Sequence, residues 1–114
     1  MNLLGAILYD PGTAGSVVTT SLTAMTAFDT TNLRLAFTIP THGLVKVRLA
    51  VTHTASTTIA QVLLGIMDGS NIRARVSSQA NLLQTAIASS QVKLEADFVI
   101  SGLVAGAVSW DAAY

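Results

Sequence analysis

The stretch from Leu33 to Thr54 constrains the fold most, because apolar and polar residues alternate along it on both sides of a turn. Successive side chains of a β-strand point to opposite faces, so this alternation gives each half one buried and one wetter face. The turn is Pro40-Thr41-His42-Gly43, in which proline presets one φ and glycine supplies another that closes the turn. We therefore expect a β-hairpin between residues 33–39 and 45–51, as part of a two-layer β protein.

The same alternation predicts further strands. The clearest run is Gln91 to Ile100, and Ile59 to Met67 is apolar at both odd and even positions. A strand that is apolar on both faces is packed on both faces, so we expect a sheet centre or a subunit contact at residues 59–67. The segment Asp68-Gly69-Ser70-Asn71 indicates a tight hairpin. Its return strand should turn Ile72, Ala74 and Val76 inward and Arg73 and Arg75 outward.

Weaker strand patterns cover residues 3–8, 17–20, 22–28 and 107–114, and residues 82–88 are either irregular or a strand. Many short strands between turns, without a convincing helix, indicate an all-β fold, namely an antiparallel β-sandwich or jelly roll. A chain of 114 residues is expected to form one domain, residues 1–114. Since the chain stops at Tyr114 inside a predicted strand, we expect either a truncated or processed product or a sheet completed by a neighbour.

Composition excludes several classes of protein. Six basic residues balance six acidic ones, which argues against binding to nucleic acid or to an anionic membrane surface. There is no cysteine, so neither a disulfide scaffold nor a thiolate metal site is possible. Charged residues make up 11% of the chain and hydrophobic residues 51%. Because a chain so poor in charge has surface to hide, we expect an obligate oligomer rather than a small monomer whose surface is rich in Thr, Ser and Ala.

No catalytic, metal-binding or cofactor-binding residue is predicted, and the chain is not expected to be an enzyme. Glu95 and Asp97 lie two residues apart on one strand face, at a spacing that overlaps that of inverting glycosidase carboxylates. A solvent-exposed charged face produces the same pattern more often. We expect these carboxylates to pair across strands with Lys46 and Arg48, or with Arg73 and Arg75.

The histidines and aromatic residues suggest only weak alternatives. His53 shares the parity of the buried positions, so it is either a core-edge histidine or, in a threefold assembly, an ion ligand near the axis. His42 lies in the turn and is expected to be solvated. Trp110, Tyr114 and Tyr9 are candidates for a glycan-stacking site, but a core role is favoured for Trp110 as the single tryptophan. The binding residues themselves stay unassigned.

Four segments resemble a domain of tailed-bacteriophage virion proteins, over about residue 17 to the end. They are LTAMTAFDTTNLR at residues 22–34, FTIP and GLVKVR at 37–40 and 43–48, LGIMDGS at 64–70, and FVISGL at 98–103. Such domains are trimeric jelly rolls, similar to the complement and tumour-necrosis-factor modules, and occur in head fibres, capsid decorations and tail proteins. In them more strands usually follow the region equivalent to residues 110–114.

The resemblance implies a non-enzymatic structural protein of the virion, assembled in the host cytoplasm as a homotrimer. It would decorate or cement the capsid, or form part of a fibre, with major capsid or tail proteins as partners. The alternative is a receptor- or carbohydrate-binding module of a tail fibre, with a host-surface glycan as partner. No cofactor, nucleic acid or membrane is expected.

Overall fold

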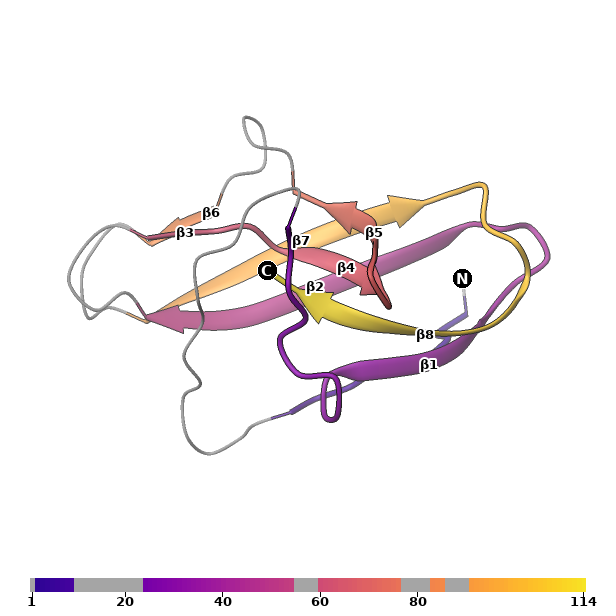
Figure 1. Cartoon of the computed structure of the whole chain (residues 1–114), viewed down its shortest axis with the longest axis horizontal. Coiled ribbons are helices and arrows are strands. Elements are labelled where there is room, and N and C mark those ends of the chain that lie inside the picture. The colour runs from indigo at the N-terminus through magenta and orange to yellow at the C-terminus, as the bar shows by residue number, and fades with distance from the viewer. Residues whose placement is uncertain (1, 10–23, 55–59, 77–82, 86–90) are drawn as a thin grey trace.

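The computed structural model describes residues 2–9, 24–54, 60–76, 83–85 and 91–114 (Figure 1). Within these residues there is no helix, and all regular structure is β-strand. The strands are β1 (Arg34–Ile39), β2 (Val45–Thr54), β3 (Ala60–Val62), β4 (Gly65–Asp68), β5 (Asn71–Arg75), β6 (Leu83–Thr85), β7 (Gln91–Ile100) and β8 (Gly106–Ala113). The prediction of an all-β fold is confirmed.

The strand pairs are nested and antiparallel. β1 pairs with β8, β2 with β7, β3 with β6, and β4 with β5. The chain is therefore arranged as a long two-stranded ribbon that is folded over on itself (Figure 1). β4 also pairs with β8, which places β1, β8, β4 and β5 in one four-stranded sheet, whereas β2–β7 and β3–β6 are two-stranded.

The predicted hairpin between residues 33–39 and 45–51 is wrong. Both strands form, and Gly43 N donates to Pro40 O at 3.0 Å across the predicted turn. The turn nevertheless connects two different sheets, because β1 pairs with β8 and β2 pairs with β7. Alternation defines which face of a strand is buried, but it does not define the partner of that strand.

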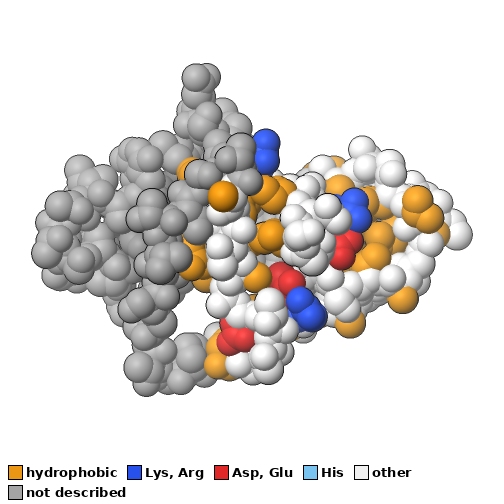
Figure 2. Space-filling model, in the orientation of Figure 1, with side chains coloured by type: hydrophobic (Ala, Val, Ile, Leu, Met, Phe, Trp, Pro, Cys, Tyr) orange, Lys and Arg blue, Asp and Glu red, His pale blue; other side chains and the backbone are white. Residues whose placement is uncertain are grey.

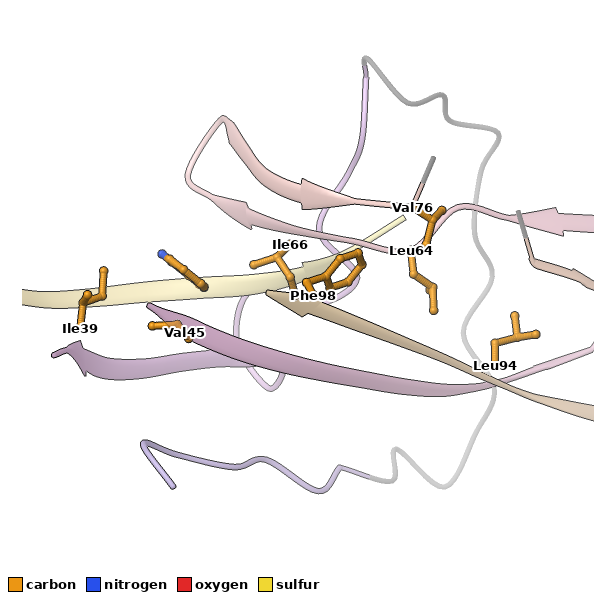
Figure 3. Close-up of a cluster of buried hydrophobic side chains, with 8 residues drawn as sticks. Ile39, Val45, Leu64, Ile66, Val76, Leu94 and Phe98 are labelled. Atoms are coloured by element: carbon orange, nitrogen blue, oxygen red, sulfur yellow. The ribbon is translucent and has the colours of Figure 1, made fainter. Parts of the chain in front are cut away.

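The main core lies between the four-stranded sheet and the β2–β7 ribbon. Ile39, Ile66 and Trp110 from the sheet belong to the same buried cluster as Val45, Leu94 and Phe98 from the ribbon (Figure 3). Trp110 is 4% exposed, and its ring meets Phe37 edge to face with centroids 5.0 Å apart. The core role predicted for Trp110 is confirmed.

A second apolar cluster involves the opposite face of β4. Met25, Met67 and Ala113 are buried together, and residues 24–28 run along the end of β8, with Thr26 N donating to Tyr114 O at 2.9 Å. A Cβ atom on Gly65 would lie 2.5 Å from Met25 Cε and 2.8 Å from the backbone oxygen of Ala74, and since that backbone cannot move aside, the position requires glycine. β4 is thus buried on both faces within one subunit, which confirms the sheet-centre alternative for this stretch.

Four other strand predictions need correction. Residues 59–67 do not form one strand, because β3 ends at Val62 and β4 begins at Gly65. A register shift at Ile66/Met67 places Ile72 against the second cluster, whereas Ala74 packs on the main core, so these two residues do not share one inward face. Residues 3–8 form no strand, and residues 24–28 contribute only isolated bridges.

The remaining strand predictions agree with the structure where it describes them. β7 and β8 match the predicted runs 91–100 and 107–114 closely, and the hairpin at residues 68–71 forms with Asp68 opposite Asn71. Within residues 82–88, Leu83–Thr85 is a strand. The predicted strand at 17–20 lies outside the described residues.

Candidate functional site

The carboxylates of Glu95 and Asp97 are held in ion pairs on the exposed face of β7. Arg48 Nε lies 3.0 Å from Asp97 Oδ1 across the strand pair, and Lys93 Nζ lies 2.8 Å from Glu95 Oε1. The hydrogen bond from Arg48 lowers the pKa of Asp97, and the hydrogen bond from Lys93 lowers the pKa of Glu95. A general acid needs a raised pKa, so these residues suit ion pairing rather than acid catalysis.

The predicted cross-strand pairing is therefore confirmed for Arg48 with Asp97 but not for Glu95, whose partner Lys93 is on its own strand. The expected partner Arg73 instead binds Asp68 across the β4–β5 hairpin, with Arg73 Nη2 2.8 Å from Asp68 Oδ2. Arg73 and Arg75 are both exposed, as predicted.

An ion pair that the sequence did not suggest joins exposed Arg34 of β1 to buried Asp111 of β8. Asp111 is 2% exposed, and its two carboxylate oxygens accept hydrogen bonds from Arg34 Nε and Nη2, each at 2.8 Å. Donating these hydrogen bonds to the Asp111 carboxylate raises the pKa of Arg34. This bidentate geometry is typical of a guanidinium facing a carboxylate, and it helps to fix the register of the two strands. The pair has a structural role rather than a catalytic one.

The two histidines do not form a site within the described residues. His53 lies in β2 opposite Val92, and its side chain is outside what the structure describes. His42 is exposed in the 40–43 turn, as predicted, and its Nδ1 accepts a hydrogen bond from Leu44 N at 3.2 Å.

The three aromatic residues considered for glycan stacking do not form one exposed surface. Trp110 is in the main core. Tyr114 packs on Phe28 with ring centroids 4.8 Å apart, and Tyr9 accepts a hydrogen bond from Asn32 Nδ2 at 3.2 Å. An open stacking surface that includes Trp110 is therefore excluded.

A pocket of about 220 Å³ lies between the β4–β5 hairpin and the β7–β8 connection. We call it the end pocket. Ile39, Leu103 and Val108 form apolar walls, buried Trp110 lies at its base, and the partly exposed Asp68–Arg73 ion pair stands at its edge. The residues come from four places in the sequence, which explains why no sequence motif indicated the site.

The indole of Trp110 carries an unpaired polar atom. Trp110 Nε1 is the one buried side-chain nitrogen or oxygen in the described part of the chain without a hydrogen-bond partner. Leaving such a donor unpaired costs about 1–3 kcal/mol. Because this nitrogen is closed off from solvent, it does not reach the end pocket, which is a candidate binding site by its lining residues alone.

The described residues show neither a membrane-spanning helix nor a metal-binding cluster. They contain no helix long and apolar enough to cross a membrane. They also contain no group of three or more His, Cys, Asp or Glu side chains placed to hold a metal ion. Comparisons of the chain with protein-family models, curated proteins and solved structures found no match.

Proposed function

We propose that the chain is a non-enzymatic structural protein of a bacteriophage particle, folded as a jelly roll and assembled as a homotrimer. Its role is to decorate or cement the capsid, or to form part of a fibre, by burying apolar surface between subunits and against other virion proteins. The protein acts in the virion and is assembled in the host cytoplasm. The sequence resemblance supports the virion assignment, and the exposed apolar side chains of the subunit support the oligomer.

The observation that carries the oligomer is the exposure of large apolar side chains. Leu3 is 85% exposed, Leu8 102% and Val104 86%. Leu4, Ile7, Tyr9, Leu44 and Val99 are also exposed. In the space-filling view, hydrophobic side chains gather at the end formed by the β1–β2 and β7–β8 connections (Figure 2). Scattered apolar residues are normal on a monomer, whereas groups of them mark contact surfaces.

The nested strand pairs support the jelly roll, because rolling up a long two-stranded ribbon produces pairs of this kind. The first strand lies beside the last, the second beside the last but one, and so on inward to the β4–β5 hairpin. The core between the β1-β8-β4-β5 sheet and the β2–β7 ribbon is also consistent with two layers.

The oligomer is tested by light scattering on the purified chain. We expect the mass of a trimer at micromolar concentration. The double variant Leu3→Ser/Leu8→Ser should shift the mass toward the monomer, because it removes the two most exposed leucines of residues 2–9. Ala6→Ser is the matched control, since Ala6 is exposed in the same segment. A monomeric wild-type protein would overturn the trimer.

The virion assignment has a separate test. Mass spectrometry of particles purified from the phage or prophage that encodes the chain should detect its peptides at a stoichiometry of many copies per particle. Absence of the chain from particles that contain their other structural proteins would overturn the assignment, whatever the oligomeric state.

A further inference from the structure

We propose that the end pocket receives the side chain of Leu8 from a second copy of the chain. The pocket has apolar walls, and Leu8 is fully exposed in the apolar segment of residues 2–9, which we call the N-terminal arm. The inference rests on the proposed oligomer, because it concerns a contact between subunits. It goes further than that proposal by assigning the two surfaces that meet.

The N-terminal arm is attached to its own subunit on both sides of Leu8. The backbone of Gly5 lies against Leu35, since a Cβ atom on Gly5 would lie 3.0 Å from Leu35 Cδ1. Farther along the arm, Asn32 Nδ2 donates a hydrogen bond to the hydroxyl of Tyr9 at 3.2 Å. Leu8 lies between these two contacts, and its side chain reaches into solvent. A large apolar side chain that is already held in place binds a partner at a lower entropic cost.

Leu8 does not fill the end pocket of its own subunit. Tyr9 is held at Asn32, before the start of β1, whereas Ile39 at the pocket is the last residue of β1. The six residues of β1 span about 20 Å, which is several times the length of a leucine side chain. None of the residues that line the pocket belongs to the N-terminal arm. Filling the pocket with Leu8 therefore requires a second copy.

The size and the lining of the end pocket suit one branched apolar side chain. Its volume is about 220 Å³, and an apolar cavity of about 150 Å³ already holds a benzene ring. Ile39, Leu103 and Val108 offer apolar contacts to a leucine. At the edge, Arg73 Nη2 lies 2.8 Å from Asp68 Oδ2, so these two charges neutralise each other. The N-terminal arm has no charged residue, and its docking leaves this ion pair intact.

Exposed apolar residues beside the end pocket enlarge the surface that the N-terminal arm covers. Val104 lines the pocket and is 86% exposed. Leu44 is also exposed, and it follows Gly43, whose carbonyl oxygen accepts a hydrogen bond from Leu103 N at 3.1 Å. This hydrogen bond joins the 40–43 turn to the β7–β8 connection, at the end where hydrophobic side chains gather in Figure 2. The other apolar side chains of the arm therefore have an apolar surface to pack on.

The positions of Leu8 and the end pocket determine the kind of assembly. Leu8 of one copy meets the pocket of the next copy, so the contact joins two different surfaces of the chain. Contacts of this kind repeat around a ring when the rotation closes, and otherwise they continue into a filament. A ring of three such contacts is the proposed trimer, and it leaves no pocket unfilled.

Disulfide trapping in the full-length chain tests this contact. The chain has no cysteine, so Leu8→Cys/Val104→Cys carries only the two introduced thiols. Docking brings position 8 of one subunit to position 104 of the next, so mild oxidation should join the subunits and yield a covalent trimer on a denaturing gel. Leu8→Cys/Ala50→Cys is the matched control, since Ala50 is exposed on β2 outside the pocket. This control should stay unlinked.

A single substitution tests the contact without cysteine. Leu8→Ser should raise the concentration at which half of the chain is assembled by about tenfold or more, because the pocket loses its apolar occupant. Leu3 is the matched position, since it is also highly exposed in the N-terminal arm. Leu3→Ser should raise this concentration less, because Leu3 does not enter the pocket.

The outcomes separate this contact from the oligomer itself. If the wild-type protein is a trimer but Leu8→Cys/Val104→Cys is linked no more than its control, the contact is overturned and the oligomer stands. Equal effects of Leu8→Ser and Leu3→Ser would also overturn the contact. A monomeric wild-type protein would overturn the oligomer and the contact together.

Discussion

Asp111 shows that the parity of a strand residue does not define its exposure. It lies on the same face of β8 as Ser109, which is exposed, but Asp111 is 2% exposed. On that face its neighbour Ala113 is covered with Met25 and Met67 in the second cluster. The sequence shows a polar residue at an outward position, and it contains no signal that residues 24–28 cross over this end of the sheet. The Arg34–Asp111 pair was missed for that reason.

Replacing Arg34 should destabilise the fold more than replacing Arg48. Removing Arg34 leaves the buried Asp111 carboxylate without its guanidinium partner, which lowers the free energy of unfolding. Arg34→Met should therefore lower the urea midpoint clearly, whereas Arg48→Met breaks an exposed pair and should change it little. The double change Arg34→Met/Asp111→Asn should recover part of the loss, because the buried charge is gone. Equal midpoints for the two single variants would contradict this account.

The exposed carboxylates on β7 predict a loss of stability in acid. The pKa of Asp97 lies below its ordinary value of 3.8 and that of Glu95 below 4.5 in the folded state. Above these values both groups are ionised whether the chain is folded or not, and their stabilisation is fully present. As pH falls further, the unfolded chain takes up protons first, so the free energy of unfolding should decrease between about pH 5 and pH 3.

Urea midpoints measured across this pH range test the acid effect. Asp97→Asn removes one of the titrating groups, so its stability should depend less steeply on pH than that of the wild-type protein. The same slope in both proteins would show that Asp97 does not contribute.

At the scale of strands, unbroken alternation predicted where a strand forms, but it did not predict which strand pairs with it. β7 was predicted to its boundaries because its alternation is unbroken, and the β4–β5 hairpin was predicted because Gly69 and Ser70 join adjacent strands. The β1 and β2 runs alternate just as clearly, but their partners are between 37 residues (Thr54 to Gln91) and 77 residues (Arg34 to Asp111) away in the chain. Pairing at that distance depends on tertiary packing, which no local pattern encodes.

Engineered disulfides should distinguish the observed strand pairing from the predicted hairpin. Ala36 lies opposite Ser109 in the β1–β8 register, and opposite residues of antiparallel strands are close enough for a disulfide. Ala36→Cys/Ser109→Cys should therefore oxidise readily to an intramolecular bridge. The hairpin would instead bring Ala36 close to Arg48, so Ala36→Cys/Arg48→Cys should stay reduced. The chain has no cysteine of its own to confuse the thiol count. If only Ala36→Cys/Arg48→Cys oxidised, the result would support the predicted hairpin against the observed β1–β8 pairing.

At the scale of the whole molecule, the end pocket could not be predicted from sequence. Its walls come from the end of β1, the β4–β5 hairpin, the β7–β8 connection and β8. These segments meet only because the chain folds back on itself with β1 beside β8 and β4 beside β8. Composition, by contrast, is a property of the whole chain, and the low charge content anticipated the exposed apolar side chains.

The exposed large apolar side chains lead to a prediction about the unfolding temperature. If subunits separate as they unfold, the folded trimer is favoured by mass action, and the midpoint must rise with protein concentration. For three subunits, each tenfold rise in concentration adds about 2.7 kcal/mol per trimer, twice the value of one tenfold factor. Calorimetric midpoints at three concentrations spanning two decades should therefore increase steadily for the wild-type protein. They should increase less for Leu3→Ser/Leu8→Ser, whose surface no longer favours assembly, and a wild-type midpoint independent of concentration would mean that the subunit is stable alone.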